Sequence, residues 1–117
     1  MIVNVGIDIV EVARIAEAAQ KPGFVERILT VREREVIRTP LRIAGRWAAK
    51  EAIAKAVGLH LSWHDVEILP ADDGKPVVEI HHADWNTQAF RIHVSITHEK
   101  GHAAAVAVLE NRAMDSL

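Results

Sequence analysis

The sequence has no cysteine, and only 4% of its residues are aromatic. The lack of cysteine excludes disulfide bonds, a thiol nucleophile and a cysteine-based zinc or iron–sulfur site. No apolar run approaches the roughly 20 residues of a membrane-spanning helix, and the N-terminus lacks the basic start and long apolar stretch of a signal peptide. We therefore expect an aliphatic core, no membrane segment and a location in the cytoplasm.

The length and composition are those of one globular domain, residues 1–117. Half of the residues are apolar and 26% are charged, which excludes a disordered, collagenous or coiled-coil chain. A chain this short has little room for an enclosed enzyme cleft. An active site shared between subunits would remove that limit.

The formal net charge of -2 conceals an uneven distribution along the chain. Residues 21–55 contain nine Lys or Arg against four Glu, a net charge of +5, whereas residues 1–20 carry -2 and residues 56–117 carry -5. A basic middle segment is compatible with an anionic partner. One interpretation is a non-enzymatic protein that binds nucleic acid or an acidic protein through its arginines: Arg32, Arg34, Arg38 and Arg42.

The hydrophobic pattern predicts an α+β fold that starts with a strand, continues with helices and ends in an antiparallel meander. Residues 2–10 alternate, with Val3, Val5, Ile7 and Ile9 on one face of a strand. The second half of the chain again has a period of two. We expect strands at residues 66–69 and 77–80, joined as a hairpin, at 91–97, and at 102–109, the last buried on both faces.

Helices are expected between the first strand and this meander. A short one begins at Val12 and stops at Lys21-Pro22-Gly23, and a second covers residues 24–29. A capping box at Thr30 and Glu33 starts a third that ends near residue 38. The longest helix covers residues 41–57 and ends at Gly58. Its helical spacing places Arg46 and Lys50 together on the exposed side, with Glu51 and Lys55 beside them.

The residues from His98 to His102 match the zinc-protease pattern H-E-x-x-H. That pattern needs a helix, which brings the two histidines onto one face. Here it lies between two predicted strands, and no third histidine follows. We therefore regard a zinc protease as a weak alternative.

Two carboxylates are stronger candidates for chemistry. Asp8 lies near the end of the first strand in an apolar stretch, where a carboxylate needs a cation or hydrogen-bond donors, and Glu51 lies on the long helix. Two carboxylates suit Mg²⁺, which keeps other positions open for water and phosphate. The alternative is structural: Glu51 and Lys55 form an ordinary i, i+4 pair and Asp8 ends a strand.

At these positions the sequence resembles the bacterial holo-[acyl-carrier-protein] synthases, a family of small 4'-phosphopantetheinyl transferases. The resemblance rests on Gly6-Ile7-Asp8, on the helix with Trp47, Lys50, Glu51 and Lys55, and on further blocks in the family's order. These blocks are Arg27-Ile28-Leu29-Thr30 with Glu33, Gly74-Lys75-Pro76, and Val94-Ser95-Ile96-Thr97-His98. Together they extend from residue 6 to about residue 110.

The resemblance implies the phosphopantetheinyl transferase fold and transfer of 4'-phosphopantetheine from coenzyme A to a serine of apo-acyl carrier protein, for fatty acid biosynthesis. Asp8 and Glu51 would bind Mg²⁺, and Lys55 would stabilise or protonate the leaving phosphate. Either Asp8 or a metal-bound water would accept the serine proton. The family also implies a homotrimer with active sites between subunits, and no nucleic acid or membrane partner.

The resemblance also assigns binding residues. Those along coenzyme A would be Arg46, Lys50, Lys75, Pro76, Thr97 and His98. Those facing the acidic helix of the carrier protein would be Arg14, Lys21 and Arg27. The chain departs from the family pattern at Ala54, where a serine is frequent, and in shorter segments after Thr30 and after Val57. These departures affect the expected loop contacts with coenzyme A and leave Asp8 and Glu51 in place.

Overall fold

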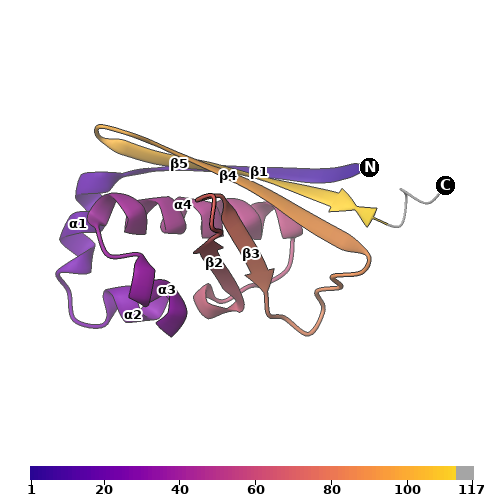
Figure 1. Ribbon diagram of the computed structural model, residues 1–117, viewed down its shortest axis with the longest axis horizontal. Helices are drawn as coiled ribbons and strands as arrows, with labels where there is room; N and C mark the ends of the chain where they lie inside the picture. The colour runs from indigo at the N-terminus through magenta and orange to yellow at the C-terminus, as the bar shows by residue number, and fades with distance from the viewer. Residues whose placement is uncertain (113–117) are drawn as a thin grey trace.

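The computed structural model describes residues 1–112 and has the expected mixture of helices and antiparallel strands (Figure 1). The elements, in chain order, are β1 (Ile2–Glu11), α1 (Val12–Ala19), α2 (Phe24–Ile28), α3 (Val31–Val36), α4 (Pro40–Val57), the 3₁₀ turn η1 (Trp63–Asp65), β2 (Val66–Pro70), β3 (Pro76–Ile80), β4 (Phe90–Glu99) and β5 (His102–Asn111). The predicted α+β class is confirmed.

The strands form two separate sheets. β1, β5 and β4 make a three-stranded antiparallel sheet in that order, whereas β2 and β3 make a two-stranded sheet. Asp8 is paired with Ala105, which is paired in turn with Ile96. The predicted meander is therefore divided, because β3 and β4 lie near each other without a shared ladder.

Helix α4 lies between two layers. The three-stranded sheet covers one side, and α2, α3 and the β2–β3 hairpin lie on the other side, as Figure 1 shows. A helix packed on both sides is apolar or paired around most of its circumference. The buried residues on α4 are accordingly numerous: Ile43, Ala44, Gly45, Arg46, Ala48, Ala49, Lys50, Ala52, Ile53 and Ala56.

Small residues bring α4 close to the sheet. A methyl group on Gly6 would overlap the backbone carbonyl of Ala52, so only glycine permits this approach of strand to helix. Ala52 and Ala56 on the helix, with Ala103 and Ala105 on β5, belong to the same buried core. This contact fixes β1 against α4 just before Asp8.

Local signals account for the ends of the helices. Thr30 and Glu33 form the predicted capping box, with Thr30 accepting from the Glu33 amide and the Glu33 carboxylate accepting from the Thr30 amide. Helix α3 ends at Val36, two residues earlier than expected. Thr39 caps α4, Pro40 occupies its first turn, and Gly58 ends it with a φ of 74°, a conformation that favours glycine.

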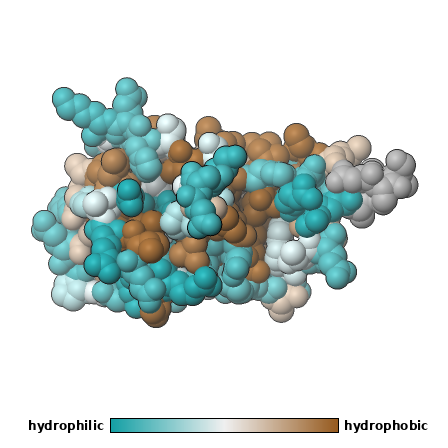
Figure 2. All heavy atoms as spheres, in the orientation of Figure 1, coloured by the Kyte–Doolittle hydropathy of each residue, from teal (hydrophilic) through white to brown (hydrophobic). Residues whose placement is uncertain are grey.

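One face of the three-stranded sheet has no covering layer within residues 1–112. The alternation predicted for β1 is correct, but its apolar residues point away from α4 and are more than half exposed: Val3, Val5, Ile7 and Ile9. Alternate residues of β5 share this face, so the expectation that β5 is buried on both faces is wrong for the single chain. Figure 2 shows hydrophobic atoms along the upper edge of the molecule, where Figure 1 places the three-stranded sheet.

Candidate active site

An ion pair joins β1 to α4 at the predicted catalytic residues. Lys55 Nζ lies 3.3 Å from Asp8 Oδ1 and donates a hydrogen bond to the carbonyl of Ile7 at 3.0 Å. The Asp8 side chain is 19% exposed and that of Lys55 is 55% exposed. Asp8 and Lys55 are far apart in the sequence, and the packing of β1 against α4 brings them together.

Glu51 lies one helical turn before Lys55 on α4. Asn4 contacts the carbonyl of Ala56 and Gly6 contacts Ala52, so β1 and α4 run in opposite directions along their contact. Two strand residues advance about 6.6 Å, slightly more than one helical turn. Asp8 therefore lies along a turn of α4 that precedes Ala52, and Glu51 directly precedes Ala52 on that helix.

A hollow of about 330 Å³ adjoins the Asp8–Lys55 pair. It is lined by Ile7, Asp8, Ile9, Lys55 and Ala104. Ile7, Ile9 and Ala104 belong to the uncovered apolar face of the sheet, so the hollow opens where that face meets the ion pair. A second chain placed on this face would complete the wall of the site.

The donor set fits a divalent cation that prefers oxygen. Asp8 Oδ1 is held by Lys55, while no side chain within residues 1–112 forms a hydrogen bond or ion pair with the Glu51 carboxylate. Glu51 is half-buried beside a small hollow that it shares with Ala54 and Trp63. Two carboxylates and no nitrogen or sulfur ligand are typical of Mg²⁺ rather than of zinc.

Asn4 is a site residue that sequence reasoning did not identify. Its amide nitrogen donates to the carbonyls of Lys55 at 3.3 Å and Ala56 at 3.1 Å, both near the C-terminus of α4. These carbonyls have no partner within the helix. Asn4 lies on the same face of β1 as Gly6 and Asp8. A polar residue on that face of an otherwise apolar strand is the sequence pattern that could have identified Asn4 as a candidate site residue.

The prediction that Lys50 lies on the exposed side of α4 is wrong, because α2, α3 and η1 cover it. Lys50 is only 3% exposed and its Nζ donates to Glu33 Oε1 at 2.7 Å, to the Ile28 carbonyl at 2.7 Å and to the Trp63 carbonyl at 3.0 Å. Burial lowers the pKa of Lys50, and the Glu33 carboxylate opposes that effect.

Arg46 is also buried, at 8% exposure, so its predicted placement on the exposed side is likewise wrong. Its Nε donates to the Ile68 carbonyl on β2 at 3.2 Å. Burial lowers the pKa of Arg46, Glu33 raises it, and the nearby Arg42 lowers it. A guanidinium has five donors, so this single bond leaves others for a ligand phosphate.

The other residues predicted along coenzyme A lie around the hairpin and β4. Lys75 and Pro76 line a hollow of about 410 Å³ together with residues 92–96 of β4. The Lys75 side chain is 82% exposed, 3.8 Å from Asp73. Thr97 and His98 are adjacent on β4 and point to opposite faces, with His98 against Gly45 of α4.

The zinc-protease pattern is not on a helix. His98 and His102 lie on the β4–β5 hairpin, where Glu99 is paired with His102 and His98 with Ala103. The register places His98 on the face toward α4 and His102 on the opposite face. Two imidazoles that point to opposite faces cannot bind one zinc ion, so the structure excludes this alternative.

The residues predicted to face the carrier protein lie at the α1–α2 end of the molecule. Lys21 and Arg27 line one hollow of about 480 Å³ with Phe24, and the Arg27 guanidinium lies 5.6 Å from the centre of the Phe24 ring. Arg14 is exposed on α1. Lys21 and Arg27 are not adjacent in the sequence, and the fold brings them to the same hollow.

Three of the four arginines considered for an anion-binding surface have intramolecular partners. Arg32 pairs with Glu67 at 3.1 Å, Arg34 donates to the Leu29 carbonyl and Arg38 donates to the Glu35 carbonyl. Their contacts stabilise α3 and its ends. These partners weaken the interpretation of a non-enzymatic anion binder.

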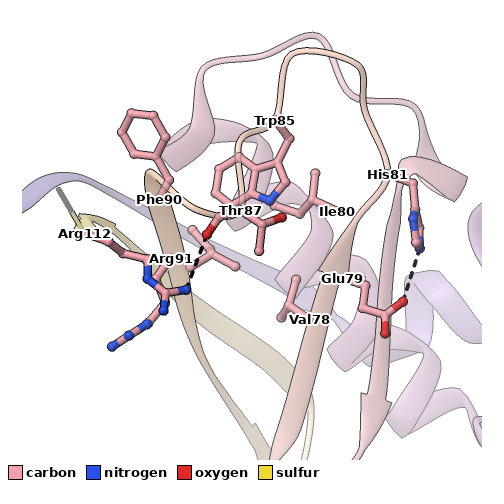
Figure 3. Close-up of a pocket in the computed structure, with 10 residues that line it drawn as sticks. Val78, Glu79, Ile80, His81, Trp85, Thr87, Phe90, Arg91 and Arg112 are labelled. Atoms are coloured by element: carbon pink, nitrogen blue, oxygen red, sulfur yellow. Dashed lines mark hydrogen bonds and ion pairs between the residues drawn. The ribbon is translucent and has the colours of Figure 1, made fainter.

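A different group of ligand-type atoms lies on the β2–β3 hairpin. One atom each from Glu67, Glu79 and His81 lies within 4.8 Å of the others. Glu67 is already bound to Thr30 Oγ1 at 2.6 Å and to Arg32, and His81 points to Glu79, as Figure 3 shows beside a hollow of about 380 Å³. This group is separate from Asp8 and Glu51 and is held by structural contacts.

Comparison with known proteins identifies the family of the chain. The profile of the 4'-phosphopantetheinyl transferase superfamily matches residues 4–108. The chain belongs to this superfamily. Within residues 1–112, no helix combines the length and the apolar character needed to cross a membrane.

Individual members of the superfamily are similar over nearly the whole chain. The holo-[acyl-carrier-protein] synthase of Shouchella clausii is 45% identical over 121 aligned residues, covering 94% of this chain and 99% of the relative. That of Halalkalibacterium halodurans is 46% identical, covering 94% and 97%. The predicted family and enzyme class are confirmed.

Solved structures of the superfamily share the fold. The Bacillus anthracis holo-(acyl-carrier-protein) synthase in complex with CoA (3',5'-ADP) has a TM-score of 0.83 and 40% identity, covering 95% of this chain and 98% of that one. The Helicobacter pylori enzyme in complex with coenzyme A has a TM-score of 0.80 and 32% identity, covering 91% and 99%.

Proposed function

We propose that this phosphopantetheinyl transferase moves 4'-phosphopantetheine from coenzyme A to a serine of apo-acyl carrier protein, in the cytoplasm and in support of fatty acid biosynthesis. The observation that carries the proposal is the Asp8–Lys55 ion pair, with Glu51 one helical turn before Lys55 on α4. The similar enzymes in complex with coenzyme A support the choice of substrate. The products are holo-acyl carrier protein and adenosine 3',5'-bisphosphate.

The reaction is a phosphoryl transfer in which the serine oxygen bonds to the β-phosphorus while the bond to the adenosine bisphosphate oxygen breaks. In the proposed mechanism the Lys55 ammonium group, which is 55% exposed beside Asp8, offsets the charge that develops on the leaving phosphate. Asp8 accepts a hydrogen bond from Lys55. The proposed acceptor of the serine proton is Asp8 or a water bound at the metal site. Asn4 holds the carbonyl end of α4 beside Lys55.

Asp8 and Glu51 are the proposed ligands of Mg²⁺. The bound ion would polarise the pyrophosphate oxygens. The two carboxylates come from β1 and α4, and the close contact of Gly6 with Ala52 holds that strand against that helix. Along coenzyme A we propose Arg46, Lys75, Pro76, Thr97 and His98. Lys50 is left out because its three protons already have protein acceptors.

We propose that Arg14, Lys21 and Arg27 bind the acidic helix of the carrier protein. Two of these three cations share a hollow on α1 and α2, which supports one continuous basic surface. Charges of this kind steer an acidic partner and are screened by salt. The carrier serine must then reach Asp8 from that end of the molecule.

A homotrimer with active sites between subunits is the proposed assembly. Four exposed apolar side chains of β1 form a contiguous row on a face that nothing in the described chain covers. The hollow beside Asp8 opens onto that face, so a neighbouring subunit would reach the site. Thr97 lies on this outer face and His98 on the inner one, as expected if they serve different sites.

The decisive experiment is incubation of the protein with apo-acyl carrier protein, coenzyme A and Mg²⁺, followed by intact mass measurement of the carrier. We expect a gain of one phosphopantetheine group, with labelling lost in Asp8→Ala and Glu51→Ala. Lys100→Ala changes an exposed turn lysine and serves as the matched control. A carrier of unchanged mass, or wild-type rates in both acidic variants, would overturn the proposed function.

A further inference from the structure

Lys50 has a fully committed ammonium group although it precedes Glu51 directly. An ammonium has three protons, and Lys50 has three oxygen acceptors within 3.0 Å. A phosphate contact would require the loss of at least one of these bonds in a side chain that is 3% exposed. All three protons of Lys50 are therefore used in bonds to the protein itself, and none is left for a phosphate of the substrate.

The three acceptors come from three different segments. The carbonyl of Ile28 is at the end of α2, Glu33 is in the first turn of α3, and the carbonyl of Trp63 begins η1. Glu33 extends the connection, since its carboxylate also accepts from the backbone amides of Thr30 at 2.9 Å and Ile68 at 2.8 Å. One lysine thus joins α4 to α2, α3 and η1.

Helix α2 depends on such contacts for its position. It has five residues, Phe24–Ile28, too few to be stable alone. Lys50 holds its last residue, and at its first residue the Phe24 ring stacks on Trp47 of α4 with ring centres 5.8 Å apart. Arg27 lies between these two attachments.

We propose that Lys50 is a positioning residue that fixes α2, and with it the basic surface of Lys21 and Arg27, relative to Asp8 and Glu51. The inference rests on the proposed role of that surface in binding the carrier protein. Lys50 then determines how the carrier serine is placed relative to the site and makes no contact with coenzyme A. A merely structural role would lower the amount of folded enzyme and leave both KM values unchanged.

The test is steady-state kinetics of full-length Lys50→Met, with apo-carrier protein varied at saturating coenzyme A and then the reverse. Assays are run at a temperature where circular dichroism shows the variant to be folded. We expect KM for the carrier to rise about tenfold, because a displaced surface binds the carrier out of register, and KM for coenzyme A to stay within about twofold. An equal rise for coenzyme A, or no rise for the carrier, overturns the proposal.

Two further variants keep the test decisive. Trp47→Leu removes the other attachment of α2 from the α4 side, where the side chain does not line the hollow of Lys21 and Arg27 and no buried charge is left unpaired, so it should show the same selective rise if Lys50→Met does not fold. Ile53→Val is a matched control, since it removes a methylene group from a buried position of α4 whose side chain takes no part in the hydrogen bonds of this network. It should lower stability and leave both KM values unchanged, and a selective rise there would contradict the proposal.

Arg27→Ala separates the failure of this inference from that of the proposed function. If Arg27→Ala raises KM for the carrier and Lys50→Met does not, the positioning role is wrong and the carrier surface stands. If Arg27→Ala leaves KM for the carrier unchanged, the proposed carrier surface is wrong, and the positioning role is overturned with it.

Discussion

Lys55 reaches from α4 to β1 and places its Nζ 3.3 Å from Oδ1 of Asp8. The Lys55 side chain is 55% exposed, so the direct contribution of the pair to stability is about 0–1 kcal/mol. In the proposed mechanism the pair matters because it positions a positive charge beside a carboxylate and a hollow that opens to solvent.

Lys55→Met should therefore reduce kcat by about 10²-fold, because charge on the leaving phosphate loses its partner, while the free energy of unfolding changes by less than about 1 kcal/mol. Carrier labelling rates and urea denaturation measure the two effects. Lys55→Arg retains the charge and should be less impaired. Equal activity of Lys55→Met and the wild type would remove Lys55 from the mechanism.

Gly6→Ala should destabilise the protein by about 1–3 kcal/mol, because the added methyl group overlaps the Ala52 carbonyl and pushes β1 from α4. The same shift separates Asp8 from Glu51, so we expect the Mg²⁺ concentration for half-maximal activity to rise. Thermal unfolding and a Mg²⁺ titration check both. Gly101→Ala is the control, since Gly101 has negative φ and no atom within 4 Å of the added carbon. Equal stability of the two variants would contradict the close contact.

Glu33→Leu should cost about 3–5 kcal/mol, because it leaves the buried Lys50 ammonium without its carboxylate. Adding Lys50→Met removes that unpaired charge, so the double variant should be more stable than Glu33→Leu alone. Urea denaturation of the two single variants and the double variant gives the coupling energy. Strictly additive effects would show that the pair is not coupled.

Val5→Lys should break the proposed trimer, because it places a charge in the apolar row on β1. Light scattering after gel filtration should give three times 12.9 kDa for the wild type and a smaller mass for the variant. Val31→Lys alters an exposed valine on α3, outside the apolar row, and should leave the assembly intact. A wild-type chain that is monomeric at all concentrations would overturn the assembly.

The sequence predicted features that depend on neighbouring residues. The Thr30–Glu33 capping box, the end of α4 at Gly58 and the alternation of β1 follow from contacts within a few positions, and all three are confirmed. Family motifs also identified Asp8, Glu51 and Lys55, although only the meeting of β1 and α4 shows that Asp8 and Lys55 touch.

The sequence could not show which faces of α4 are covered. Helical spacing groups Arg46 with Lys50, but two polar residues on one face indicate solvent unless another layer lies over them. That layer comes from α2, α3 and β2, and the partner carboxylate belongs to Glu33, 17 residues earlier. Glu33 was recognisable as a capping residue, and nothing local indicated its second role.

The sequence by itself therefore determined the elements, the family and the identities of the chemical groups, because these depend on local hydrogen bonding, hydrophobic period and motif spacing. Only the tertiary structure decided which charges are buried and paired and which remain available to a ligand. Lys50 and Lys55 are five residues apart on one helix, yet one is enclosed by three segments and the other stands beside Asp8 in solvent. The difference arises because burial of a charge depends on what packs against it from distant parts of the chain.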